Sequence, residues 1–284
     1  MKTSQTVLGI DLGGTNVRAG IVAPAQELQI VSTRIRASGT EQEVLEDIYQ
    51  VADQFMHKGV THIGIGVPSV VDVEQGIVYD VANIASWKEV PLKALMEARY
   101  KVPVLVNNDA NCFVLGEKYF GQAKGVHSIV GLAIGTGMGA GIVVKDKLFS
   151  GSNCGAGEFG MVEYLDQIVE YYASGQFFRN VYKEGGEVFF ERARQGDAQA
   201  LAAFAELGTH IGNAMKTILY TYDPEMIILG GSIAQTYDFF QETMWARIRT
   251  LQFTRTVERL QVRVSGLKHA NLLGAASLWM DAAL

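Results

Sequence analysis

The sequence has few cysteines, prolines and histidines, and it has no excess of basic residues. Its two cysteines, Cys112 and Cys154, are too few for a disulfide framework. Five prolines exclude a flexible chain rich in Pro and Gly, and the five histidines show no metal-ligand spacing. No apolar run approaches the roughly 18–20 residues needed to span a membrane, and residues 1–14 lack the features of a signal peptide. We therefore expect a soluble, cytoplasmic protein.

The charge balance argues against nucleic-acid binding, because such binding needs a basic face. The chain carries 24 Lys and Arg against 30 Asp and Glu, a net charge of −6. Its 48% hydrophobic content excludes intrinsic disorder. At about 100–200 residues per domain, the 284 residues predict two domains. Glycine is abundant, at 31 residues, so the positions of the glycines become the main question.

Strands and helices are predicted to alternate along the chain, which gives an α/β class. Short apolar runs with nearby glycines predict strands, and apolar residues at helical spacing predict helices. The predicted strands are Val7–Ile10, His62–Val67, Ser128–Ile134 and Met226–Leu229. The predicted helices are Glu41–His57, Pro91–Tyr100, Ala110–Phe120, Gln167–Tyr182, Ala198–Tyr220 and Leu272–Ala283.

One short sequence occurs twice. Gly14–Val22 (GTNVRAGIV) and Gly135–Val143 (GTGMGAGIV) lie 121 residues apart and are identical at six of nine positions. In both copies an apolar strand enters a glycine-rich turn and a second apolar strand follows. Chance similarity between two strands is the alternative, but the shared turn chemistry favours duplication of a β-hairpin.

The loop Asp11–Asn16 has the composition of a phosphate- and metal-binding turn. Its paired glycines let backbone N–H groups point at phosphate oxygens, and the Thr15 hydroxyl adds a donor. Asp11 could hold Mg²⁺ directly or through water. An ordinary hairpin turn would also contain Gly and Asp. The matching loop Gly135–Gly137 favours the phosphate-binding function.

Two other nucleotide-binding motifs are excluded. The sequence contains no Gly-Lys-Ser or Gly-Lys-Thr, so it has no Walker A loop. Gly135–Ala140 matches half of a dinucleotide fingerprint, but that fingerprint requires a following helix. A strand is predicted here instead, over Ala140–Val144.

Polar residues end the predicted strand that precedes the helix Ala110–Phe120. Buried polar side chains need partners, so Asn107, Asn108 and Asp109 require an explanation. Asp109 could cap the helix. It could equally be a general base, with Asn108 binding a substrate hydroxyl beside it. The sequence leaves both roles open.

Other notable residues are ambiguous when each is considered alone. Glu158 lies in a glycine-rich loop that would present its carboxylate, whereas Glu170 is more typical of a solvated helix residue. The cysteines are expected to be small buried hydrophobes. Four aromatic residues are expected in the core rather than in a sugar platform, namely Tyr171, Tyr172, Phe177 and Phe178.

Taken together, these motifs resemble the ROK (repressor, open reading frame, kinase) family, within the superfamily of actin-like ATPases and sugar kinases. The resemblance covers essentially the whole chain, and eight segments appear in the order typical of the family. They are Ile10–Thr15, Gly66–Asp72, Asn83–Trp87, Asn108–Asn111, Gly135–Gly139, Gly155–Gly160, Glu170–Gly175 and Ile228–Gly231.

The resemblance implies two ribonuclease-H-like lobes around a central cleft. The N-terminal lobe would hold residues 1–110 and a C-terminal helix over 271–284, and the C-terminal lobe would hold residues 111–270. The family also implies a homodimer.

The resemblance assigns a role to each matching residue. Asp109 would be the catalytic base, and Asp11 would hold Mg²⁺ through ATP. The sugar would contact Asn83, Asn108, Asp109, Glu158 and Glu170. ATP would contact Asp11, Gly13, Gly14, Thr15, Asn16, Gly135, Thr136, Gly137, Gly230 and Gly231.

The sequence departs from the family pattern at three places. Met161 stands where family kinases usually have a histidine that serves a zinc site and the sugar. The Cys-rich zinc loop is also missing, since Glu170 follows only nine positions after Met161. A variant without zinc is therefore expected. Asn107 stands where many relatives have Glu.

The function implied is ATP-dependent phosphorylation of a hexose. Glucose at its 6-hydroxyl is the first candidate, with the anomeric hydroxyl left open. N-acetylmannosamine or N-acetylglucosamine is the alternative substrate. A non-catalytic sugar-binding or actin-like assembly protein is a different class, and intact Asp109 argues against it. The family's repressors carry a helix-turn-helix before the first loop, and here that loop begins at Asp11, which leaves no room for one.

Overall fold

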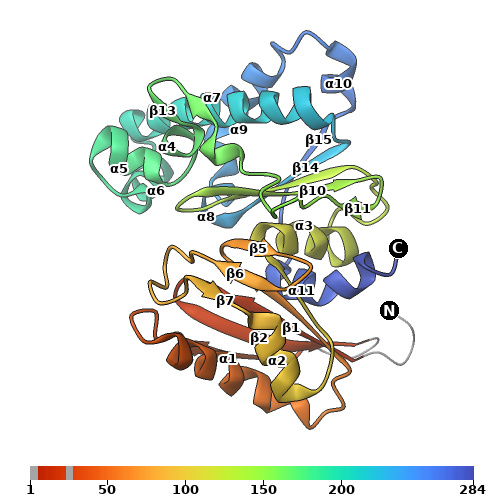
Figure 1. Ribbon diagram of the computed structural model, residues 1–284. Coiled ribbons are helices and arrows are strands. Elements are labelled where there is room, and N and C mark those ends of the chain that lie inside the picture. Colours follow the sequence, from red (N-terminus) through yellow and green to blue (C-terminus); the bar gives the residue numbers. More distant parts are fainter. Residues whose placement is uncertain (1–5, 24–27) are drawn as a thin grey trace. The chain divides into compact units, whose positions relative to one another are not determined.

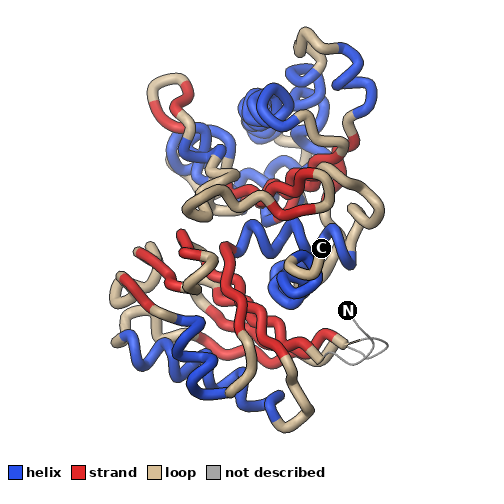
Figure 2. Tube along the Cα trace, turned by 45° about the vertical axis from the view of Figure 1, so that its right-hand side comes forward, coloured by secondary structure: helices blue, strands red, loops and turns tan. Residues whose placement is uncertain are grey.

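The structure, a computed structural model, describes residues 6–23 and 28–284. The first five residues of the segment expected to lack a signal peptide lie outside this part. The chain forms two compact units (Figures 1 and 2). The first unit comprises the described residues up to Gly125, together with Gly141–Ala156 and Leu267–Leu284. The second unit comprises Val126–Ala140 and Gly157–Gly266.

The first unit is built on a five-stranded sheet of order β3-β2-β1-β4-β8. Adjacent strands pair antiparallel from β3 to β1 and parallel from β1 to β8. The central strands are buried almost throughout, as their continuous apolar runs predict. The strands are β1 Val7–Leu12, β2 Asn16–Val22, β3 Ile30–Arg34, β4 His62–Val67 and β8 Val104–Asn108.

Helices cover both faces of this sheet. Figure 1 shows α1 (Glu41–Met56) on one side and α11 (Ala270–Asp281) on the other. A capping box starts α1, because Thr40 and Glu43 satisfy each other's backbone N–H groups. The remaining helices are α2 Leu92–Tyr100 and α3 Asp109–Phe120. A small sheet lies alongside, formed by β5 Val70–Asp72, β6 Ile77–Tyr79 and β7 Glu89–Val90.

Glycine allows α11 to pack unusually close to its neighbours. A Cβ on Gly64 of β4 would lie 1.9 Å from the carbonyl oxygen of Ala275. A Cβ on Gly274 would lie 1.6 Å from the carbonyl oxygen of Cys112 in α3. Because real side chains cannot approach so closely, this contact depends on glycine. The contact between Gly274 and Cys112 joins α3 to α11, and both helices belong to the first unit. The predicted lobe boundary had instead placed residues 111–270 in the C-terminal lobe.

A second five-stranded sheet has the order β11-β10-β9-β14-β15. The hairpin β1–β2 therefore has the same position in the first sheet as β9–β10 has in the second. The two repeated sequences follow β1 and β9. This correspondence supports duplication of the hairpin. The strands are β9 Ile129–Ile134, β10 Met138–Val144, β11 Lys147–Leu148, β14 Met226–Gly230 and β15 Gln261–Val264. The chain passes from the second unit into the first within β10.

The second unit contains most of the helices. The longest is α7 (Ala198–Tyr222), and its apolar face packs on α9 (Tyr237–Ile248). The second unit also contains a two-stranded hairpin, β12 (Glu163–Tyr164) and β13 (Gln167–Ile168), and several shorter helices. These are the 3₁₀ turn Phe159–Met161, α4 Val169–Ala173, α5 Gln176–Tyr182, α6 Gly186–Arg194, α8 Gly231–Ala234 and α10 Thr254–Arg259.

The predicted single helix Gln167–Tyr182 is wrong. Residues 167–168 form β13, and α4 and α5 are separated at Ser174, whose backbone is extended (φ −133°, ψ −175°). The Gly175 N–H donates to the Gly135 carbonyl at 2.8 Å, and the Ser174 hydroxyl donates to the Thr136 carbonyl at 2.9 Å. Hydrogen bonds to the glycine loop therefore replace the helical bonds at this break.

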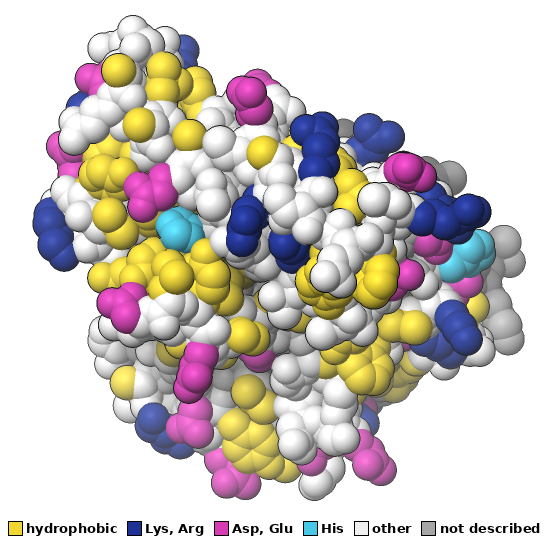
Figure 3. Space-filling model, turned by 90° about the horizontal axis from the view of Figure 1, so that it is seen from above, with side chains coloured by type: hydrophobic (Ala, Val, Ile, Leu, Met, Phe, Trp, Pro, Cys, Tyr) yellow, Lys and Arg dark blue, Asp and Glu magenta, His cyan; other side chains and the backbone are white. Residues whose placement is uncertain are grey.

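On the face drawn in Figure 3, basic and acidic side chains are interspersed between separate hydrophobic patches. Within residues 6–23 and 28–284, no helix combines the length and the apolar character needed to cross a bilayer.

Candidate active site

The first group of predicted site residues lies at the carboxyl edge of the parallel strands in the first unit. Asp11 of β1 pairs in register with Gly66 of β4, which pairs with Asn107 of β8. Asp109 follows two residues later, at the start of α3. Ligands of open α/β sheets bind at this edge, where strands end and loops begin. The sheet thus brings Asp11 and Asp109 to one edge.

Asp11 is almost completely buried, at 9% exposure. Its Oδ2 accepts a hydrogen bond from Arg18 Nη1 at 3.3 Å. Burial raises the pKa of the Asp11 carboxyl, and the positive charge of Arg18 offsets part of that rise. We did not predict Arg18 as a site residue. Its place directly opposite Asp11 in the hairpin is the signal that could have identified it.

The first glycine loop lies beside Asn83. The Gly13 N–H donates to the Asn16 carbonyl at 2.9 Å, which closes the turn and leaves Thr15 exposed. A Cβ on Gly14 would lie 2.8 Å from the Asn83 side-chain nitrogen. The exposed Asn83 side chain therefore packs against Gly14, in space that a side chain at residue 14 would occupy.

The helix cap is Asn108 rather than Asp109. Asn108 Oδ1 accepts from the Ala110 N–H at 2.8 Å, and Asn108 Nδ2 donates to the Ser69 carbonyl at 3.2 Å. These two bonds fix the Asn108 side chain. Asp109 is instead the first residue of α3, where the helix dipole favours a negative side chain. The predicted capping role of Asp109 is therefore filled by Asn108.

Asn107, Asn111 and Cys154 form a buried polar cluster, and Asn107 and Asn111 flank Asp109 in the sequence. Asn107 Oδ1 accepts from Asn111 Nδ2 at 2.9 Å and from Cys154 Sγ at 3.2 Å. Asn107 also accepts from the backbone N–H of Asn108 at 2.8 Å. Both cysteines are buried, as predicted, but Cys154 forms a hydrogen bond in addition to its packing contacts.

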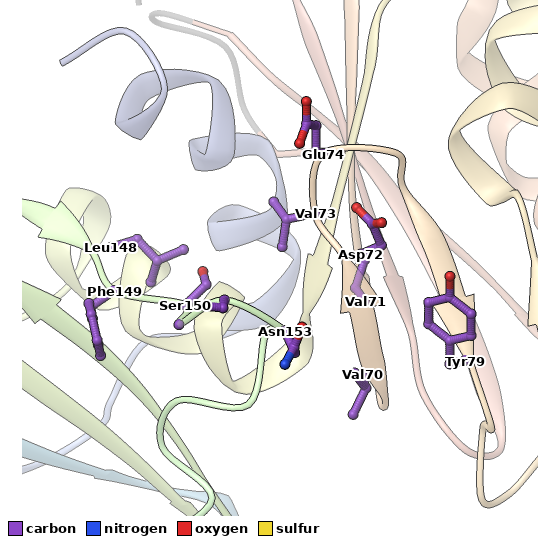
Figure 4. Close-up of a pocket in the computed structure, with 12 residues that line it drawn as sticks. Val70, Val71, Asp72, Val73, Glu74, Tyr79, Leu148, Phe149, Ser150 and Asn153 are labelled. Atoms are coloured by element: carbon purple, nitrogen blue, oxygen red, sulfur yellow. The ribbon is translucent and has the colours of Figure 1, made fainter.

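A cavity of about 860 Å³ opens in the first unit. Figure 4 shows its two walls: one carries Val70–Glu74, and the other carries Leu148–Ser150 and Asn153. Hydrogen bonds connect the segment next to each wall with the end of β8, just before Asp109. Ser69 on the first side accepts from Asn108, and Cys154 on the second side donates to Asn107. The cavity therefore flanks the segment that presents Asp109.

The second group of predicted site residues lies in the second unit, around the loop Gly135–Gly137. The Gly135 N–H donates to the Gly137 carbonyl at 2.9 Å. Glu170 Oε2 accepts from the Met138 N–H at 2.8 Å, and Glu170 Oε1 accepts from Gln176 Nε2 at 2.8 Å. Glu170 is thus no solvated helix residue, because it holds the end of the glycine loop. Gln176 is a partner that sequence reasoning missed.

Glu158 lies near Glu170 in the same unit. Partial removal from water raises the pKa of the Glu158 carboxyl, and the negative charge of Glu170 raises it further. Two carboxylates that repel each other are typical of a binding site, where function opposes stability.

We expect the variant Glu158→Gln to be slightly more stable than the wild type at neutral pH. A carboxyl with a raised pKa binds its proton more tightly in the folded protein than in the unfolded chain. Its contribution to stability is therefore lost as pH rises from about 4.5, the unfolded value, through the folded pKa. The amide removes that loss, and because Glu158 is exposed and its charge is screened by solvent, the Tm near pH 7 should rise by less than about 1 °C. Thermal melts between pH 4 and 8 would test this, and a lower Tm at pH 7 would contradict it.

A cavity of about 240 Å³ adjoins the same glycine loop. A Cβ on Gly135 would point into open space, with only Ser232 Oγ nearby, at 3.9 Å. The Gly230–Gly231 turn precedes Ser232, and Gly231 has a φ of +84° that favours glycine. Most of the lining surface is apolar, and Phe190 offers an aromatic face. Polar side chains at its edge come from Thr136, Gln176, Arg179, Glu187, Ser232, Gln235 and Thr236, a mixture that suits a nucleotide.

Met161, which is expected to stand where family kinases have a histidine, is 51% exposed at the end of the 3₁₀ turn. Across the described ranges, no three His, Cys, Asp or Glu side chains come together in a group that could hold a metal ion.

Several known proteins are similar to this chain along most of its length. A glucokinase of Thermotoga maritima is 29% identical over 96% of the chain and 96% of its own length. An N-acetyl-D-glucosamine kinase of Vibrio cholerae is 29% identical over 84% of the chain and 88% of its own length. A xylose repressor of Caldicellulosiruptor bescii is 29% identical over 78% of the chain and 63% of its own length.

The fold is shared with a ROK family glucokinase from Streptomyces griseus, solved in complex with glucose and AMPPNP. The two chains are 28% identical and have a TM-score of 0.80, covering 96% of this chain and 98% of the other. The predicted α/β class and actin-like ATPase fold are thereby confirmed. The ROK family model matches residues 7–282, so the chain belongs to the ROK family.

Proposed function

We propose that the protein transfers the γ-phosphate of ATP to a hexose, with glucose as the first candidate and its 6-hydroxyl as the acceptor. The enzyme class, an ATP-dependent sugar kinase, is confirmed by family membership and by kinase relatives along the whole chain. The observation that carries the proposal is the position of Asp109, at the strand edge it shares with Asp11 and on a helix that it does not cap.

In this proposal Asp109 accepts the proton of the attacking hydroxyl. The backbone carbonyl of Asp109 accepts from Asn271 Nδ2 at 3.3 Å, which fixes the start of α3. A positioned carboxylate is the group that kinases use to orient and deprotonate an alcohol. Asn83 and Asn108 in the first unit, and Glu158 and Glu170 in the second, are the candidate sugar-binding side chains.

ATP fits the residues that are present. Gly135, Thr136 and Ser232 line the cavity of about 240 Å³, and Gly230 and Gly231 directly precede Ser232. A side chain at Gly135 would occupy the open space beside Ser232. Gly13, Gly14, Thr15 and Asn16 form the candidate first phosphate loop. The buried carboxylate of Asp11 suits Mg²⁺, which keeps several waters and binds phosphate oxygens as well. Bound Mg²⁺ would neutralise charge on the phosphates.

An N-acetylated hexosamine is the second candidate substrate, and the cavity of about 860 Å³ favours it. This volume lies near the upper end for small-molecule sites and exceeds what one hexose ring requires. Val70 and Phe149 are each 45% exposed and line the cavity, where they would contact an acyl group.

The test is ADP release with ATP and Mg²⁺ on glucose, mannose, N-acetylglucosamine and N-acetylmannosamine. We expect turnover of at least one of these sugars. If an N-acetyl sugar is used, Val70→Trp should raise its KM about tenfold by filling the cavity, with little change for glucose. No turnover on any of the four would contradict the kinase function. Equal KM changes for both sugar types would contradict the acyl site.

The homodimer and the cytoplasmic location remain predictions. Analytical ultracentrifugation of the purified protein would test the first.

A further inference from the structure

The short hairpin β12–β13 lies between the two candidate sugar-binding carboxylates in the sequence. The Val169 N–H donates to the Val162 carbonyl at 2.9 Å and closes the hairpin. The next residue is Glu170, the second residue of α4, because β13 continues into that helix without a loop. Whatever fixes the hairpin therefore also fixes the backbone from which Glu170 reaches the glycine loop.

The hairpin has little apolar packing of its own. Leu165 at its turn is 69% exposed, and Val162 at its base is 43% exposed. A two-stranded hairpin without a buried face is only marginally stable in water. Other contacts must hold it in place.

Those contacts come from Tyr164, His210 and Asn213, which we name the Tyr164 clamp. Asn213 Nδ2 donates to the Tyr164 hydroxyl at 2.6 Å, and that hydroxyl lies 3.1 Å from His210 Nδ1. The rings of Tyr164 and His210 pack edge to face, with centroids 5.7 Å apart. Arg247 Nε donates to Asn213 Oδ1 at 2.6 Å and orients the amide. The clamp thus ties the hairpin to α7.

Tyr172 of α4 joins the same cluster. Its ring packs on Tyr164, with centroids 5.9 Å apart, and on His210, at 5.1 Å. Its hydroxyl donates to Asp166 in the hairpin turn. Glu170 therefore lies between two attached elements, the hairpin before it and Tyr172 after it.

The hydrogen bonds of the clamp have a defined direction. The Tyr164 oxygen accepts from Asn213, so its own proton is directed to His210 Nδ1. This arrangement needs a neutral His210 with its proton on Nε2, which faces Glu206 at 3.8 Å. Burial lowers the pKa of His210 and keeps the ring neutral, whereas Glu206 acts in the opposite direction.

We propose that the Tyr164 clamp positions Glu170, and through Glu170 the second glycine loop, for substrate binding. This inference rests on the proposed kinase function. Tyr164, His210 and Asn213 are positioning residues here: they act through Glu170, whose carboxylate holds the Met138 N–H at the end of the loop.

Tyr164→Phe removes the hydroxyl and keeps the ring. We expect KM for the sugar to rise about three- to tenfold, which is the loss of about one hydrogen bond, with kcat within about twofold. Tyr220→Phe is the matched control, because Tyr220 is an exposed tyrosine of α7, the helix that carries His210 and Asn213, and it is not part of the clamp. An unchanged KM in Tyr164→Phe, or an equal change in the control, would overturn the proposal.

Two histidine variants separate hydrogen bonding from packing. His210→Asn keeps an acceptor oxygen near the place of Nδ1 and should retain a near-normal KM, whereas His210→Leu should behave like Tyr164→Phe. Equal defects in both variants would show that the hydrogen bond is not what positions Glu170.

A readout without catalysis keeps this test independent of the kinase function. Tyr164→Phe should speed amide hydrogen exchange at Met138 and across residues 162–170, and Tyr220→Phe should leave both unchanged. If the wild type phosphorylates no sugar, the proposed function fails while this measurement still decides the clamp. Unchanged exchange in Tyr164→Phe would overturn the clamp even if the kinase is active.

Discussion

Replacing Asp109 with asparagine is expected to lower kcat about a thousandfold while the protein folds normally. Asparagine has the shape of aspartate but cannot accept the proton of the attacking hydroxyl. The fold should tolerate the change because Asn108, rather than Asp109, caps α3. The bond from Asn271 goes to the backbone carbonyl of residue 109 and is retained. Steady-state ADP release at saturating sugar and ATP, together with a thermal melt, measures both effects.

Asp80→Asn provides the matched control in the same unit. The Asp80 side chain is 77% exposed and forms only a surface ion pair with Lys88, at 3.4 Å. Its positive φ of 44° is one that asparagine adopts readily. This variant should keep normal kcat and Tm. If Asp109→Asn retained more than a few per cent of wild-type kcat, Asp109 would not be the base.

Gly231→Ala is expected to weaken nucleotide binding at least tenfold and to lower the Tm by about 5 °C or more. Gly231 has a φ of +84°, and a Cβ there would lie 2.3 Å from the Ile134 carbonyl and 3.1 Å from the Gly135 nitrogen. Since both neighbours are backbone atoms, the clash can be relieved only by moving the second glycine loop. Titration calorimetry with AMPPNP measures the affinity without turnover.

Gly196→Ala separates that clash from backbone strain. Gly196 has a nearly identical φ of +81°, but a Cβ there meets nothing within 4 Å. This variant should lose about 1 kcal/mol of stability and bind AMPPNP normally. Normal binding in Gly231→Ala, or equal loss in both variants, would remove Gly231 from the nucleotide site.

Local patterns in the sequence predicted much of the fold correctly. The short apolar runs with nearby glycines became β1, β4, β9 and β14, because a buried strand must be apolar on both faces. Helical periodicity located α1, α7 and α11 within a few residues of their ends. The two repeated sequences predicted a duplicated hairpin, and β1–β2 and β9–β10 occupy matching places in their sheets.

Features that depend on tertiary contacts were missed. Residues 167–182 have helical spacing, but hydrogen bonds from Ser174 and Gly175 to the glycine loop break the helix. The partners of Glu170 and Tyr164 lie six to 49 positions away in sequence, so no local pattern reveals them. Asn108 and Asp109 are both good helix caps, and only the structure distinguishes them.

The order in which the chain visits the two units has a consequence for biosynthesis. The chain changes unit four times, and its last visit delivers α11 to the sheet that the first strands begin. The backbone contact between Gly64 and Ala275 therefore cannot form until residue 275 has left the ribosome. The N-terminal unit is begun first and completed last. A stop codon that removes only the final 15 residues would leave its sheet without one of its covering helices.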